Sequence, residues 1–220
     1  MGVLNALEFG APQRRNRFVF IGVKNEIAQN IEMPTGTFTK DNYNTVKDAI
    51  KDIENVRTVF ETSEDSGAEL TDDFEPTSLT PLLRDSKKLY NHIITKTRAV
   101  AKARFEALGQ GENFHFLDVT LKENTYTDVS RTQNTIYQRL NYEKPSGTVV
   151  NVRKSMWIHP TINRAVSIRE AARLQTFPDS FVFCGTKDSQ YQQVGNAVPP
   201  ILAKAIAEHL ASYLDQKKNG

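Results

Sequence analysis

The sequence predicts an α/β fold, on the evidence of one strand pattern and two helix patterns. Residues 17–23 form a short run of β-branched and aromatic side chains, which is typical of a buried strand preceded by a polar loop. Ser167 and Glu170 have the spacing of a capping box, in which hydroxyl and carboxylate satisfy the first free amides of a helix. A helix is therefore expected over 168–176. A second, apolar helix is expected to follow the Pro-Pro pair at 199–200.

The last helix is expected to need a partner surface. Pro199 and Pro200 suit its first turn, because backbone amides there have no helical acceptor. Its apolar stripe consists of Leu202, Ala205, Ile206, Leu210 and Tyr213. An uncovered stripe of this kind predicts that the isolated chain self-associates or is poorly soluble.

Patterns in the middle of the chain are weaker. Residues 46–53 are predicted to form a short helix with one apolar face, followed by a loop that continues to Pro81. The longest helical pattern spans residues 82–108, as one helix or two, with Gly109 as the stop. Residues 148–152 are β-prone and follow the turn-forming sequence Pro-Ser-Gly, so a strand is expected there.

Charge is unevenly distributed along the 220 residues, although the net charge is only +2. Residues 61–75 contain seven acids and no base, and are expected to form a surface loop. Bases gather in two regions. Between residues 80 and 110 they are Arg84, Lys87, Lys88, Lys96, Arg98, Lys102 and Arg104, and between residues 130 and 175 they are Arg131, Arg139, Lys144, Arg153, Lys154, Arg164, Arg169 and Arg173. Such clusters suit a nucleic-acid backbone, and solvated helix surfaces explain them equally well.

Several classes of protein are disfavoured by composition. No apolar run approaches the roughly 20 residues of a membrane span, so we expect a cytoplasmic protein with no membrane partner. The single Cys184 excludes intrachain disulfides and cysteine-based zinc clusters. The four histidines are scattered without ligand spacing, and no metal site is expected.

Three blocks carry a family resemblance. Residues 10–17 read Gly-Ala-Pro-Gln-Arg-Arg-Asn-Arg, and residues 169–179 read Arg-Glu-Ala-Ala-Arg-Leu-Gln-Thr-Phe-Pro-Asp. Residues 190–200 read Gln-Tyr-Gln-Gln-Val-Gly-Asn-Ala-Val-Pro-Pro. In this order, with a long variable middle, the three blocks resemble the C-terminal portion of bacterial cytosine-5 DNA methyltransferases. We refer to them as the arginine block, the penultimate block and the Gly-Asn-Ala-Val block.

The resemblance implies part of a Rossmann-like catalytic domain plus a small α+β target recognition domain. Residues 1–30 and 160–220 would belong to the catalytic domain, and residues 31–159 to the recognition domain. The penultimate block is expected to brace the recognition domain through its capped helix rather than to take part in chemistry.

Site residues are also implied by the resemblance. Methylation at C5 of cytosine needs a thiolate at C6 and a cation near O2, on a base flipped out of the stack. Arg17 is the residue expected at O2, with Arg15 beside it holding carboxylates or phosphate, and Gln13 shaping the loop. The alternative is that these are ordinary surface cations flanking a strand.

Two further groups of residues follow from the same comparison. Asn196, Ala197 and Val198 would contact the cofactor, S-adenosylmethionine, in a pocket that is incomplete in this chain; a plain helix-entry loop is the alternative. Thr148 would bond the phosphate beside the flipped base in double-stranded DNA. Groove or phosphate contacts are expected from its neighbours Asn151, Arg153, Lys154 and Ser155.

Other family motifs have no counterpart in the proper place. The family nucleophile lies in a Pro-Cys-Gln block upstream of the arginine block, and this sequence has none. Cys184 is expected to be a small apolar filler, and Glu54-Asn55-Val56 a chance copy of the family's proton-donor motif. The chain alone is thus predicted to be inactive, with its N-terminal catalytic half on another polypeptide or removed by truncation. A DNA-binding specificity module without a catalytic partner is the main alternative, and a remnant that binds nothing is a third. The target sequence, the oligomeric state and any paired restriction nuclease are not readable from the sequence.

Overall fold

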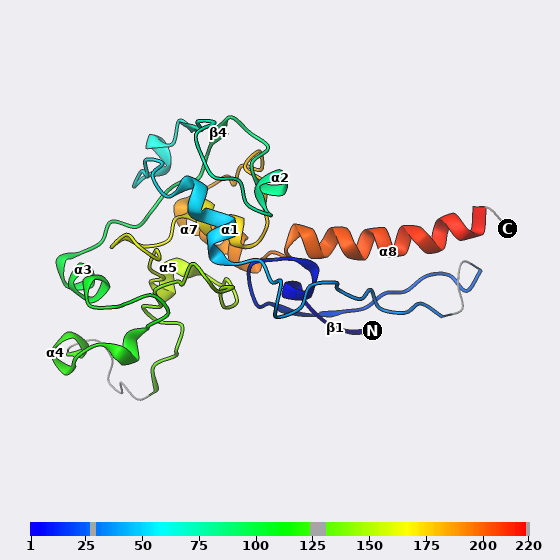
Figure 1. Cartoon of the computed structure of the whole chain (residues 1–220), viewed down its shortest axis with the longest axis horizontal. Helices are drawn as coiled ribbons and strands as arrows, with labels where there is room; N and C mark the ends of the chain where they lie inside the picture. The colour runs from blue at the N-terminus through cyan, green and yellow to red at the C-terminus, as the bar shows by residue number, and fades with distance from the viewer. Residues whose placement is uncertain (27–29, 124–130, 219–220) are drawn as a thin grey trace.

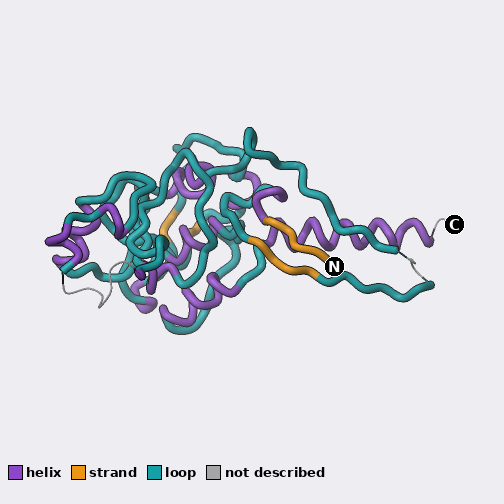
Figure 2. Tube along the Cα trace, turned by 90° about the horizontal axis from the view of Figure 1, so that it is seen from below, coloured by secondary structure: helices purple, strands orange, loops and turns teal. Residues whose placement is uncertain are grey.

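In the computed structural model, which describes residues 1–26, 30–123 and 131–218, the chain folds into a body and an arm. The arm consists of the N-terminal strands, the connector at residues 30–38 and the long helix α8 (Pro200–Lys218), which projects away from the body (Figure 1). The perpendicular view in Figure 2 shows the same projection. No helix in these described ranges is both long and apolar enough to cross a bilayer.

Two strands and α8 build the arm. Strand β1 (Gly2–Asn5) pairs antiparallel with β2 (Asn16–Val19), and the 3-10 turn η1 (Ala6–Phe9) follows β1. The apolar stripe of α8 packs on this hairpin and on the connector, in a cluster of Leu4, Ala6, Phe9, Ala11 and Leu202, with Val19, Met33, Ile201, Ala205 and Ile206 around it. The connector is also tied to the helix, because His209 Nε2 lies 2.7 Å from the carbonyl oxygen of Glu32. The final helix is confirmed, and the first part of its stripe, at Leu202, Ala205 and Ile206, packs within the chain.

The strand expected over residues 17–23 is shorter and less buried than predicted. It ends at Val19, and Phe18 and Phe20 are 58% and 74% exposed. Side chains alternate along a strand, so Phe18 and Phe20 share one face, together with Val3, which pairs with Phe18 and is 63% exposed. Among the described residues the sheet has only these two strands, and nothing covers that face. The run is apolar, as a buried strand would be, but the structure leaves one side bare.

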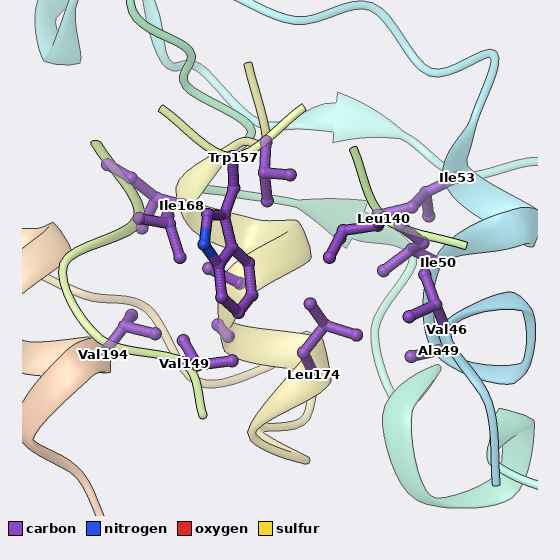
Figure 3. Packing of buried hydrophobic residues seen from close by; sticks show 14 of the residues in the cluster. Val46, Ala49, Ile50, Ile53, Leu140, Val149, Trp157, Ile168, Leu174 and Val194 are labelled. Atoms are coloured by element: carbon purple, nitrogen blue, oxygen red, sulfur yellow. The ribbon is translucent and has the colours of Figure 1, made fainter. Parts of the chain in front are cut away.

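Two predicted helices of the body are confirmed, and both begin at a capping box. Helix α1 (Val46–Ile50) continues as the 3-10 turn η2 (Lys51–Ile53), with Thr45 and Asp48 as the box. Helix α6 (Ile168–Leu174) begins at Ser167, whose hydroxyl accepts from the amide of Glu170. Every residue of α6 is buried. Trp157 packs beside α6, with Val149, Leu140 and α1 around it (Figure 3).

The helical pattern expected over residues 82–108, as one helix or two, is confirmed only in part. The segment contains α2 (Thr80–Leu83), the strand β4 (Lys88–Leu89), which pairs with β3 (Ala68–Glu69), and α3 (Ala99–Glu106). Between β4 and α3 the backbone of residues 91–94 is hydrogen-bonded to residues distant in the sequence, at Val59 and at the start of α6. The carbonyl of Ile93 accepts from the amide of Ile168 at 3.1 Å, and so provides for one of the free amides at the start of α6.

The strand expected over residues 148–152 is also wrong. Asn151 caps the short helix α5 (Val152–Ser155), and its side chain accepts from the amide of Lys154. The remaining elements of the described chain are η3 (Thr62–Glu64), η4 (Phe114–Phe116), α4 (Val119–Lys122) and α7 (Lys187–Asn196). Helix α7 was not predicted, although it contains most of the Gly-Asn-Ala-Val block.

The buried clusters group the chain differently from the expected domain limits. One cluster joins residues 46–93 with residues 140–194, so the penultimate block and α7 share a core with the middle of the chain. A second cluster unites α3, η4 and the segment around Ile158. A third cluster is the core of the arm: its buried residues come from residues 4–11 and from Leu202 of α8, and Val19 and Met33 pack against them.

Candidate active-site edge

Gln13 lies at the centre of a buried polar network. Its side chain is fully buried, and its Nε2 donates to the Leu174 carbonyl at 3.0 Å and to Gln175 Oε1 at 2.8 Å. Its Oε1 accepts from the backbone amide of Val149 at 3.1 Å. The arginine block is thereby bound both to the penultimate block and to the segment around Thr148.

Arg15 connects the same segment to the end of α7. Its guanidinium is 1% exposed, and it donates to the Val149 carbonyl at 2.5 Å and to the Gly195 carbonyl at 2.7 Å. Gln175 Nε2 donates to the preceding carbonyl of the helix, that of Val194, at 2.6 Å. The last carbonyls of a helix have no partner within it, and here two of them are satisfied by Arg15 and Gln175. A cation at this end also suits the helix dipole.

Gly195 allows two backbones to touch. A Cβ built on it would stand 2.8 Å from the carbonyl carbon of Val150 and 3.1 Å from the amide nitrogen of Asn151. No side chain fits at that distance from main-chain atoms. The glycine is therefore required by close approach of α7 to residues 150–151.

The environment of Arg15 differs from the one expected. Among the described residues it holds carbonyl oxygens and no carboxylate, and its Nε has no hydrogen-bond partner. A buried cation without a countercharge is costly. The side chain shapes the site from within, rather than reaching a phosphate on the surface.

Arg17 remains partly exposed, unlike the buried Arg15, and the neighbouring Arg14 is exposed as well. Arg17 is half-buried, and within the described part of the chain its guanidinium bonds only to the Asn16 carbonyl, from Nη1 at 3.0 Å. It shares a strand face with Val19, which packs against the core of the arm, so it lies opposite the bare face of Phe18. This position leaves its charge free to meet a ligand.

The expected cofactor residues form the turn between α7 and α8. Asn196 is the last residue of α7 and is exposed, with its Oδ1 accepting from Gln192 Nε2 at 2.8 Å. Ala197 caps the helix in extended conformation, and Val198 is 45% exposed. The turn thus offers an amide and an apolar side chain to solvent, directly after the carbonyl that Arg15 holds.

The expected DNA contacts divide into exposed and buried residues. Thr148 is exposed and its hydroxyl donates to the Arg14 carbonyl at 2.7 Å, while Lys154 is exposed. Arg153 forms an ion pair with Asp188 of α7, and Asn151 caps α5. Ser155 was expected to contact DNA, but it is only 5% exposed. It lies on the inner face of α5, where its hydroxyl donates to the Asn151 carbonyl.

Four arginines of the basic clusters are also corrections, because Arg104, Arg139, Arg169 and Arg173 are buried. Arg173 provides the clearest reason. Its guanidinium donates to Asp179 Oδ1 at 2.8 Å and to Asp52 Oδ1 at 2.5 Å. These two carboxylates compensate its charge inside the body, so it does not contribute to a basic surface. The exposed bases of these clusters are Lys87, Lys88, Lys96, Arg98, Lys102, Arg131, Lys144 and Lys154.

The two apparent copies of other family motifs lack the required chemistry. Burial raises the pKa of Glu54, but hydrogen bonds from Lys51, Thr161 and Tyr142 outweigh it and lower the pKa to about 2. An acid ionised at neutral pH does not donate a proton, which agrees with a chance match. Cys184 is exposed rather than an apolar filler, because it follows the Phe183 anchor in the loop before α7.

Gln175 was missed as a functional candidate. It is fully buried and joins Gln13 to Val194. Its place within the penultimate block was the only signal in the sequence, and that block was assigned to bracing alone.

Comparison with known proteins identifies the family. The profile of the family described as C-5 cytosine-specific DNA methylase matches residues 1–212. Type II methyltransferase M.DdeI of Desulfomicrobium norvegicum is 32% identical over 97% of this chain and 54% of its own length. Type II methyltransferase M1.HphI of Haemophilus parahaemolyticus is 37% identical over 94% of this chain and 46% of its own.

A solved structure shows the same fold. It is described as a DNA modification methyltransferase encoded within a prophage of E. coli, and it superposes with a TM-score of 0.74 at 24% identity. The match covers 97% of this chain and 59% of that one. The chain thus spans about half the length of the curated relatives named above. With a profile match over nearly all of its residues, the chain belongs to the C-5 cytosine-specific DNA methylase family.

Proposed function

We propose that this chain supplies DNA target recognition and one edge of the active site of a cytosine-5 DNA methyltransferase. The enzyme transfers a methyl group from S-adenosylmethionine to C5 of a flipped cytosine. One observation carries the proposal: Arg15 bonds to the Gly195 carbonyl and to the Val149 carbonyl. The arginine block, the proposed cofactor turn and the proposed DNA segment therefore meet at one place.

Each arginine then has its own task. Arg17, half-buried and without a carboxylate partner among the described residues, approaches O2 of the flipped cytosine and stabilises the charge that develops on the ring. Arg15 and Gln13 act behind it, by holding the backbone of the site in place. The half-exposed face of β2 is the side from which the base enters.

Asn196, Ala197 and Val198 contact the cofactor. Their turn presents a side-chain amide and an apolar surface, which fit a polar and an aromatic part of S-adenosylmethionine respectively. When bound, the cofactor supplies the methyl group. The other walls of its pocket lie outside this chain.

The DNA segment is residues 148–154. Thr148 and Lys154 are exposed and reach phosphates, whereas Asn151 and Arg153 need to exchange their present partners to reach a groove. The eight exposed bases given above widen the electrostatic surface. In this proposal the recognition domain is residues 31–159 and is bound to the catalytic portions by the shared core.

The chain alone transfers no methyl group. It carries no Pro-Cys-Gln sequence, and its one cysteine lies in an exposed loop before α7. The partner is an N-terminal catalytic half, on the same gene or as a separate subunit. One observation supports such a partner: the bare face of Val3, Phe18 and Phe20.

Methyl transfer to duplex DNA tests the proposal. The chain is mixed with N-terminal halves of family members, beginning with that of M.DdeI, together with S-adenosylmethionine carrying a labelled methyl group. Transfer is expected only in the mixture. Arg17→Gln is expected to lower kcat by roughly 100-fold or more, whereas Arg14→Gln, a neighbouring exposed arginine, should retain it.

Failure of transfer with every complement, combined with retained DNA binding, would favour the non-catalytic specificity module. DNA binding itself is measured across a salt series. Lys154→Gln should reduce the slope of log K against log salt by about 1, as expected for the loss of one phosphate contact.

A further inference from the structure

The end of α7 is held by side chains from two distant blocks. Its carbonyl at Val194 receives Gln175 Nε2 and also the amide of Ala197, at 2.6 and 3.3 Å. The next carbonyl, at Gly195, receives Arg15. Ala197 follows the end of α7 in the proposed cofactor turn. The direction in which the turn leaves the helix therefore depends on the hydrogen bonds that Gln175 and Arg15 donate to the Val194 and Gly195 carbonyls.

We infer that Gln175 is a positioning residue that couples the proposed DNA segment to the proposed cofactor turn. A relay of hydrogen bonds runs from the Val149 amide to Gln13 Oε1, from Gln13 Nε2 to Gln175 Oε1, and from Gln175 Nε2 to the Val194 carbonyl. This inference rests on the proposed function, because it assigns ligands to the two ends of the relay.

The relay is fully occupied and dry. Gln13 and Gln175 are both 0% exposed, and each uses both its amide oxygen and its amide nitrogen in it. A buried polar group that loses its partner bears the whole cost of desolvation. If the Val149 end or the Val194 end of the relay moves, a hydrogen bond of Gln13 or Gln175 breaks. Because both side chains are fully buried, water does not take the place of the lost partner.

A second contact transmits the same displacement. The backbone of Val150 and Asn151 lies against Gly195 with no room for a side chain. If residues 148–151 move when DNA binds, their backbone displaces Gly195 in the last turn of α7 by direct contact. The relay transmits the same movement to the Val194 carbonyl through its hydrogen bonds. Coupling between two sites is reciprocal, so a ligand at either end must affect binding at the other.

Gln175→Met provides the test, since methionine keeps the length and removes both hydrogen-bonding atoms. The matched control is Gln193→Met on α7, whose exposed amide bonds to the Cys184 carbonyl and to Ser189. The readout is amide hydrogen exchange of the chain, with and without a short duplex DNA as the probe.

In the native chain, duplex DNA is expected to slow exchange both at residues 148–151 and at residues 194–198. In Gln175→Met the relay is cut, but the contact of Val150 with Gly195 remains. DNA should therefore slow the first segment as in the native chain and the second segment clearly less, whereas Gln193→Met should behave as the native chain. An unaltered response at 194–198 in Gln175→Met, or no response there in the native chain that binds DNA, overturns the inference.

DNA-free exchange separates this inference from the proposed function. If the chain binds no DNA, the proposed function fails, but the relay is still tested. Gln175→Met should then exchange the Val149 amide and residues 194–198 roughly tenfold faster together, since each buried bond lost exposes its neighbours. Faster exchange at 194–198 with Val149 unchanged would reduce Gln175 to a local helix cap and overturn the coupling.

Discussion

Gly195→Ala tests the contact on which the site depends. The added Cβ would lie 2.8 and 2.9 Å from the carbonyl carbon and oxygen of Val150, and these main-chain atoms cannot rotate away. Forcing extra volume into a packed place costs about 1–3 kcal/mol. Alanine is a better helix former than glycine by at most about 1 kcal/mol, and less in a last turn. We therefore expect a net loss of unfolding free energy of about 1–2 kcal/mol.

Urea unfolding measures this difference, as a lower midpoint with an unchanged slope. The matched control is Gly147→Ala, at the beginning of the same DNA segment, where an added Cβ meets nothing within 4 Å. Its effect should be neutral or stabilising by up to about 1 kcal/mol, through the unfolded chain. DNA affinity should fall in Gly195→Ala, because residues 150–151 are displaced, and stay close to native in the control. A Gly195→Ala chain as stable as the native one, with native DNA affinity, would refute the close approach.

Three further outcomes are expected. Arg173→Met removes the buried guanidinium that joins Asp52 and Asp179, which keep only Arg84 at 2.9 Å and Arg169 at 3.9 Å as partners. It should lower the unfolding free energy by about 3 kcal/mol, measured in urea. Burial lowers the pKa of His92 and of His159 from 6.5 to about 4, so the unfolded chain binds protons first as pH falls below 6.5. Stability should thus drop between pH 6.5 and 4, by about 2 kcal/mol per histidine at pH 5, and His92→Asn should remove part of this dependence. Replacing Phe18 and Phe20 by serine should abolish self-association in sedimentation experiments, because the bare face of the hairpin, not the stripe of α8, is uncovered.

Elements that depend on local sequence were predictable. The capping box at Ser167 and Glu170 requires only residues three apart, and it begins α6 where expected. The proline pair before α8 is equally local. The arginine block could be placed beside the Gly-Asn-Ala-Val block only through the family resemblance, since Arg15 and Gly195 are distant in sequence and the contact between them is tertiary.

Elements that depend on distant partners were not predictable. Residues 91–94 are all buried and lie within an apolar pattern, and periodicity alone does not separate a buried extended segment from a helix. The segment is extended because it pairs with the backbone of Val59. The Val59 amide donates to the His92 carbonyl, and the Ile94 amide donates to the Val59 carbonyl. Among the described residues no strand of that kind lies beside residues 148–150, and the backbone amide and carbonyl of Val149 bond instead to the side chains of Gln13 and Arg15.

Burial separates the roles of two arginines that the sequence presents as equivalent. Arg15 is 1% exposed and bonds to two carbonyls, so a ligand reaches it only if the site is dismantled. Arg17 is half-buried on the strand face that looks toward the core of the arm. If the two were interchangeable, Arg15→Lys and Arg17→Lys would affect activity alike. The structure instead predicts that Arg15→Lys loses stability, because an ammonium does not span two carbonyls as a guanidinium does. Arg17→Lys should fold normally and lose turnover in the completed enzyme, since its charge has no structural partner to support.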